Sequence, residues 1–142
     1  MPSLLSMLQP HFTFLEHTAD IKIKITGSTL NEIFEHAVQA IAHYTNSGSP
    51  ITSKKGKVIE VQGTDTQSLL ANFIDELLYQ IDAEHFVTAK ASVLLRGNNL
   101  KAEIFGDDTK NYHLTHIKAA TYADMEITKK KSGWEAIVVL DV

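Results

Sequence analysis

Alternation of apolar and polar residues marks the first regular element of the chain. Isoleucine and lysine alternate from Ile21 to Ile25, the period of a half-buried β-strand, and Gly27 follows as a breaker. A helix is predicted next, because Thr29 and Glu32 have the spacing of a capping box. Its apolar positions recur three and four residues apart, at Leu30, Ile33, Phe34, Ala37, Val38 and Ile41.

A second amphipathic helix is predicted to begin near Asp65 or Thr66. Turn residues at 46–50 and a short strand candidate from Val58 to Gln62 separate it from the first helix. Two helices with one apolar face each need a broad apolar partner, which a sheet supplies. The second apolar stripe consists of Leu70, Phe73, Ile74, Leu77, Leu78 and Ile81.

Strand patterns dominate the second half of the chain. Alternating apolar residues over 87–95 and 100–104 flank a short turn and predict a hairpin. Further strands are expected over 117–128 and over 134–141.

This order, β-α-β-α and then several antiparallel strands, predicts a single α+β domain. We expect a mostly antiparallel sheet with two amphipathic helices packed on one face. The domain is expected to span residues 11–142, after a loosely ordered N-terminal extension at 1–10.

Composition narrows the function. The 142 residues, 44 % of them hydrophobic, suit one globular domain. The absence of cysteine excludes disulfides, thiolate metal sites and thiol nucleophiles in this chain. A net charge of −4 argues against direct, tight binding of nucleic acid. No apolar run reaches the roughly 18 residues of a membrane span, so the cytoplasm is the expected compartment.

Two aspartates stand at the ends of strands that we expect to pair. If the strand ending at Asp141 runs antiparallel to the strand starting at Ile21, Asp20 and Asp141 meet at one rim. Val142, the last residue of the sequence, would add a carbonyl and, as a chain end, a carboxylate. Two close carboxylates either repel each other or bind a cation, and oxygen ligands of this kind suit Ca²⁺ or Mg²⁺.

Other polar clusters have ordinary structural interpretations. The Glu16–Asp20 segment reads as a solvated loop with a capping aspartate. His113 and His116 lack metal-ligand spacing, and the lysines at 129–131 suit an edge-protecting turn. Four acidic residues lie on the second predicted helix and around its end, and they suit a face exposed to solvent: Asp75, Glu76, Asp82 and Glu84.

Four stretches, taken together, resemble the archease family. The segment Phe14-Leu15-Glu16-His17-Thr18-Ala19-Asp20 is similar to the opening motif of that family, and residues 73–84 are similar to its second-helix signature. Residues 117–122 resemble its late strand, and Gly133-Trp134 through Val138-Val139-Leu140-Asp141-Val142 resemble its C-terminal end. The resemblance covers roughly residues 12–142, in order and at similar spacing.

The resemblance implies a non-catalytic protein that activates an RtcB-type RNA ligase. Archeases promote guanylylation of the ligase and support multiple turnover in tRNA splicing or RNA repair. The ligase is then the direct partner, RNA is a partner only indirectly, and neither DNA nor a membrane is expected to be bound.

The resemblance also implies a divalent cation, Ca²⁺ with Mg²⁺ or Mn²⁺ as alternatives. By position, its ligands correspond to Asp20, Asp141 and Val142. Positions that would face the partner or support these ligands are Glu16, His17, Lys118 and Tyr122.

The sequence departs from the family pattern at two places. Ala123 stands where the family commonly has histidine. If that histidine contributes to the interface or the site, its role is missing here or is taken by another residue such as His116. Phe73 stands where tryptophan is usual, a packing change that should be tolerated. Two alternative functions stay open: a chaperone-like modulator of another RNA-modifying enzyme, and a stand-alone metal-dependent phosphohydrolase. The second lacks an evident base–nucleophile pair and a phosphate-cradling loop.

Overall fold

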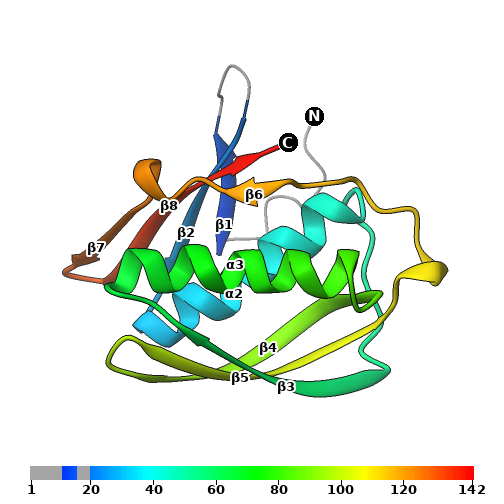
Figure 1. The fold of residues 1–142 in the computed structure, drawn as a ribbon. Coiled ribbons are helices and arrows are strands. Elements are labelled where there is room, and N and C mark those ends of the chain that lie inside the picture. The colour runs from blue at the N-terminus through cyan, green and yellow to red at the C-terminus, as the bar shows by residue number, and fades with distance from the viewer. Residues whose placement is uncertain (1–10, 16–19) are drawn as a thin grey trace.

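The computed structural model describes residues 11–15 and 20–142, and its strands form two antiparallel sheets (Figure 1). The predicted extension at 1–10 lies outside the described residues. The five-stranded sheet has the order β1 (Phe12–Leu15), β2 (Ile21–Gly27), β8 (Gly133–Asp141) and β6 (Ala119–Ala120), with β7 (Glu126–Lys130) also paired to β8. The three-stranded sheet has the order β3 (Lys55–Gln62), β5 (Asn99–Asp108) and β4 (Phe86–Arg96).

The two helices, α2 (Leu30–Thr45) and α3 (Thr66–Asp82), lie between the sheets (Figure 1). Helix α2 contacts β2 and β4, and α3 contacts β3, β4 and β6. The predicted α+β class, with two helices and antiparallel strands, is confirmed. The strands, however, form two sheets instead of the single expected sheet. Each helix is therefore covered on two sides, which explains why α2 buries Ala40 and Ala42 in addition to its predicted stripe.

Side-chain caps fix where both helices begin. The Thr29 hydroxyl accepts the Glu32 N–H at 3.2 Å, and the Glu32 carboxylate accepts the Ser28 N–H at 3.0 Å. Asp65 caps α3 by accepting the Ser68 N–H at 2.7 Å. These bonds satisfy amide groups that a first helical turn leaves without partners. Both predicted helix starts are therefore confirmed.

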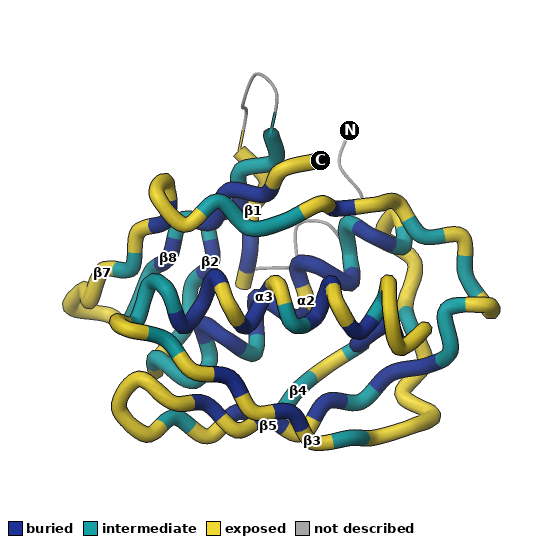
Figure 2. The backbone as a smooth tube through the Cα atoms, in the orientation of Figure 1, coloured by how far each residue is buried: buried dark blue, intermediate teal, exposed yellow. Residues whose placement is uncertain are grey.

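The apolar core fills the space between the sheets and around the helices (Figure 2). Phe34 on α2 and Phe73 on α3 are both fully buried, with ring centroids 5.8 Å apart. This aromatic pair joins the two helices at the centre of the domain. Phe73 thus occupies a site where its ring is completely packed.

The predicted strand over 117–128 is interrupted. Its first part forms only the two residues of β6, a 3₁₀ turn (Tyr122–Asp124) follows, and β7 then resumes pairing with β8. Ala120 lies opposite Leu140, so an unbroken register would place Ala123 opposite Ile137. Glu126 occupies that position instead, because the turn takes up three residues. Alternation of side chains does not reveal such a loop.

Candidate functional site

The predicted rim forms where β2 begins and β8 ends. These strands pair antiparallel with Ile21 opposite Leu140, which confirms the expected pairing. If this register continued by one residue, Asp20 would lie opposite Asp141. Asp20 is half-buried, whereas Asp141 is exposed. The two carboxylate-bearing residues therefore stand at neighbouring strand ends of one sheet edge.

Strand β6 holds the other side of β8 at this rim. Ala119 lies opposite Asp141, and the Lys118 N–H donates to the Asp141 carbonyl at 2.8 Å. The Thr121 N–H donates to the Val139 carbonyl at 2.9 Å. Figure 1 shows β6 beside the end of β8. The main chain of Asp141 is thus fixed between two strands, while its side chain stays exposed.

The remaining predicted site residues are distributed around this rim. Lys118 is exposed and adjoins Asp141 through the backbone hydrogen bond already described. Val142 follows Asp141 and is 38 % exposed. Glu16 and His17 lie outside the described residues, so their assignment stays a prediction.

Tyr122 has a defined contact within the fold. Its hydroxyl donates to the Asp65 carboxylate at 2.8 Å and so reinforces the N-cap of α3. The Ser68 N–H, followed by the Tyr122 hydroxyl, holds the pKa of Asp65 below its usual value. The same bond raises the pKa of Tyr122, because ionisation would place two negative charges side by side. A partner-facing role for Tyr122 stays a prediction beside this structural role.

Asp75 has a role that the sequence did not indicate. Its carboxylate accepts the Ala120 N–H at 2.9 Å, so it links α3 to β6 rather than only facing solvent. The bond lies next to the rim, because Ala119 pairs with Asp141. A two-residue strand leaves no recognisable pattern, and the sequence therefore offered no signal for this contact.

The histidines do not assemble into a metal site in the described part of the chain. His116 approaches Asp82, with Nε2 3.8 Å from the carboxylate, and both side chains are largely exposed. Within residues 11–15 and 20–142, no group of three or more His, Asp or Glu side chains is placed to hold a metal ion. A cation at the rim would therefore need main-chain oxygens in addition to the two aspartates.

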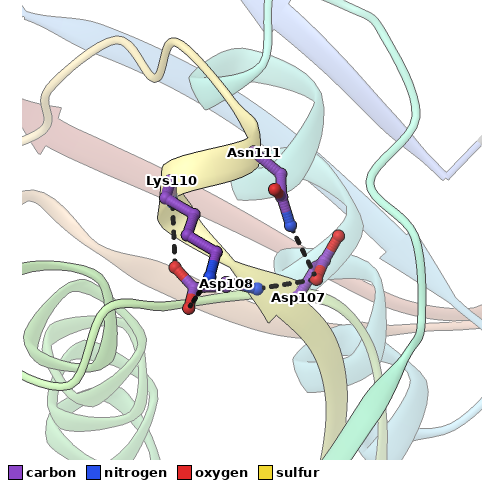
Figure 3. Close-up of polar contacts among 4 residues, drawn as sticks. All are labelled: Asp107, Asp108, Lys110 and Asn111. Carbon is purple, nitrogen blue, oxygen red and sulfur yellow. Dashed lines mark hydrogen bonds and ion pairs between the residues drawn. The ribbon is translucent and has the colours of Figure 1, made fainter.

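A second carboxylate cluster lies at the end of β5, where it serves the fold (Figure 3). Asp107 is only 2 % exposed and accepts the Asp108 N–H at 2.8 Å and the Tyr112 hydroxyl at 2.9 Å. Burial alone would raise the pKa of Asp107. The hydrogen bonds from Tyr112, the Asp108 N–H and Asn111 outweigh burial and leave that pKa below its usual value. This network anchors the loop after β5.

The fold is that of a small α+β protein in which two aspartates lie near the ends of neighbouring strands. The chain matches the Archease protein family (MTH1598/TM1083) over residues 12–142, and it belongs to that family. The archease of Pyrococcus abyssi is 37 % identical over 89 % of this chain and 95 % of that protein. The archease of Methanosarcina barkeri is 34 % identical over 92 % of this chain and 95 % of that protein.

Solved structures have the same fold. The solution structure of Methanobacterium thermoautotrophicum protein 1598 has a TM-score of 0.76 and 28 % identity, over 93 % of this chain and 99 % of that chain. A Thermotoga maritima crystal structure, described as an archease and possible chaperone, has a TM-score of 0.67 and 22 % identity. It covers 90 % of this chain and 94 % of that chain. Across the described residues, no helix is long and apolar enough to span a membrane.

Proposed function

We propose that this protein is a non-catalytic activator of an RtcB-type RNA ligase in the cytoplasm. It would promote guanylylation of the ligase and repeated turnover in tRNA splicing or RNA repair. Membership of the archease family supports this proposal. The single structural observation that supports it is the β2–β8 register, in which Ile21 lies opposite Leu140 and the next positions along the two strands are Asp20 and Asp141.

The rim would hold a divalent cation, Ca²⁺ in the first instance. Asp20, Asp141 and Val142 offer only oxygen ligands, which match the preference of a hard cation. The main chain of Asp141 is anchored by the Lys118 N–H, so its carboxylate projects from a fixed base. A cation bound there would supply positive charge toward phosphate oxygens in a partner's active site.

The target of this rim would be the ligase and not the RNA. The net charge of −4 does not favour a direct approach to a phosphate backbone. Lys118, exposed beside the rim, would contact the ligase, as would Glu16 and His17 from the opening motif and Tyr122 beyond β6. Tyr122 is 45 % exposed and can present its ring while its hydroxyl holds Asp65.

Ligation by the host's own RtcB-type ligase tests this function. With RNA in excess, product should exceed one equivalent per ligase only when the protein is added. Asp20→Asn and Asp141→Asn should abolish the gain, whereas Glu126→Gln, an exposed carboxylate of β7, should retain it. Full activation by both aspartate variants would overturn the role of the rim.

A chaperone-like modulator of another RNA-modifying enzyme is the second candidate. The description of the Thermotoga maritima archease as a possible chaperone favours it. A competent ligase whose turnover does not respond to the protein would support this alternative over ligase activation. Capture of a different RNA-modifying enzyme on the immobilised protein would then identify the partner.

A further inference from the structure

Strand β3 has an open edge on the three-stranded sheet. It pairs with β5 on one side, and no described strand pairs with its other side. Gly63 donates its N–H to the Asn98 carbonyl at 2.9 Å. In an antiparallel pair the residues that bond to the neighbouring strand alternate, so Gly63 and every second residue before it point their main-chain groups toward β5. The N–H and C=O groups of Val58, Glu60 and Gln62 therefore point away from β5.

On the opposite edge of this sheet, side chains of α2 bond both main-chain groups of one residue, Val93. On β4, the Glu35 carboxylate accepts the Val93 N–H at 2.9 Å, and the Asn31 amide donates to the Val93 carbonyl at 2.7 Å. On the open edge of β3, among the described residues, a side chain bonds only one outward main-chain group: the Asn72 amide donates to the Gln62 carbonyl at 2.9 Å. An open strand edge is a template for another strand, and proteins normally cover it.

A groove runs between this edge and α3. It has a volume of about 410 Å³ and is lined on the strand by Glu60 and Gln62. Figure 1 shows α3 passing along β3. Val58 on the strand and Tyr79 on the helix are 55 % and 53 % exposed. The helix side of the groove is formed by Asn72, Asp75, Glu76 and Tyr79.

The negative charge of the groove favours a positively charged segment of a binding partner. Glu60, Asp75 and Glu76 contribute carboxylates, and no lysine or arginine lines the groove. The lysines of β3 lie in its first half, where Lys57 donates to the Gln80 amide oxygen at 2.7 Å. Lysines discourage strand pairing, so the available edge is the second half, residues 58–62.

We propose that residues 58–62 of β3 and the facing side of α3 bind an extended, lysine- or arginine-bearing segment of a partner protein. The segment adds to β3 as a strand, with its main chain on Val58 and Glu60. Its basic side chains reach the carboxylates of Glu60 and Glu76. This docking mode goes beyond ligase activation and does not depend on the cation rim or on the identity of the partner.

Binding of synthetic octapeptides tests the proposal. Peptides in which lysine or arginine alternates with valine or tyrosine should bind saturably. They should shift the backbone amide NMR signals of residues 56–62 and 72–79. The double variant Glu60→Gln/Glu76→Gln should weaken binding at least fivefold, and Glu126→Gln, on the other sheet, should leave it unchanged. Replacing the basic residues by glutamate should abolish binding.

Backbone modification separates strand addition from charge attraction. Two peptides would be N-methylated at alternate residues. The peptide methylated at the residues whose N–H groups bond to β3 (the blocking peptide) should not bind, and the peptide methylated at the other residues should bind normally. Val58→Pro, which removes an outward N–H, should act like the blocking peptide while the thermal unfolding temperature stays close to that of the wild type. If this variant does not fold, the N-methylated peptides alone decide. Equal affinity of both methylated peptides, or no saturable binding up to millimolar concentration, overturns the proposal whatever the ligation assay shows.

Discussion

The Asp75 carboxylate of α3 accepts the backbone N–H of Ala120 in β6 at 2.9 Å. Ala119, the preceding residue, pairs with Asp141 at the end of β8. One helix side chain therefore holds the short strand that flanks the proposed cation rim. Since β6 has only two residues, this bond adds to a short pairing with β8, which the Lys118 and Thr121 N–H groups extend on either side.

Asp75→Ala should loosen β6. The free energy of unfolding should fall by about 1 kcal/mol, the usual worth of such a hydrogen bond at an exposed site. Asp75→Asn, which keeps an acceptor oxygen, should lose less. Urea unfolding measures both, and amide hydrogen exchange at Ala120 should be faster in the alanine variant. Unchanged exchange at Ala120 would show that β6 is held by its pairing to β8 alone.

Tyr122→Phe should change the titration of Asp65. Without the phenolic donor, the pKa of Asp65 should rise toward its usual value, while the Ser68 N–H still holds it below that value. The pKa of Asp65 is lower in the folded than in the unfolded protein, so its ionised carboxylate stabilises the fold. This contribution to the free energy of unfolding is fully present above the unfolded pKa of about 3.9, and it is lost as the pH falls through the folded pKa. The variant should therefore lose less stability on acidification.

Carboxyl-carbon NMR titration measures the pKa of Asp65 directly. Tyr79→Phe, which alters an exposed tyrosine on the same helix, serves as the control and should leave that pKa unchanged. An Asp65 pKa that is the same with and without the Tyr122 hydroxyl would rule out this coupling.

Local periodicity explains which parts of the fold were predictable. Both helices and the strand at 21–25 were predicted because their apolar positions repeat with a clear period, and Thr29 and Asp65 mark the helix starts by their chemistry. The choice of one sheet or two depends on which strands pair, which is a non-local property. The residues looped out between β6 and β7 continue the alternation of polar positions, at Tyr122, Asp124 and Glu126, so the pattern predicts one continuous strand there.

The candidate site was predictable to the same degree. The antiparallel pairing of the last strand with the strand at 21–25 was a conditional expectation, and the structure confirms that pairing, with Ile21 opposite Leu140. The contact of Asp75 with Ala120 joins residues 45 positions apart in sequence through one side chain. No periodic pattern encodes such a contact, so sequence reasoning assigned Asp75 to a solvated face.

Gly106→Ala should destabilise the three-stranded sheet. Gly106 lies opposite Thr88, next to the irregularity between Thr88 and Lys90. A Cβ on Gly106 would contact the Val87 carbonyl carbon at 2.8 Å and the Thr88 Cα at 3.0 Å. Since backbone cannot move aside as a side chain can, the free energy of unfolding should fall by about 3 kcal/mol.

Gly56→Ala is the matched control for this substitution. Its Cβ would meet only the Phe105 ring at 3.3 Å and the Ile104 carbonyl at 3.8 Å. The ring can shift slightly, so the loss should be well below that of Gly106→Ala in the same thermal or urea unfolding experiment. Equal losses would indicate that the close approach at Val87 relaxes easily.

Calcium should stabilise the folded protein through the rim, independently of any ligase. A cation that binds only the folded state raises the free energy of unfolding by about 2.7 kcal/mol at a concentration 100 times its dissociation constant. Asp141→Asn should lose this gain, because it removes one of the two aspartate carboxylates while the Lys118 N–H still fixes the backbone. Asp82→Asn, an exposed carboxylate near His116, should keep it. Thermal unfolding with calcium or a chelator measures the difference, and an equal calcium response in the wild type and Asp141→Asn would place the cation elsewhere.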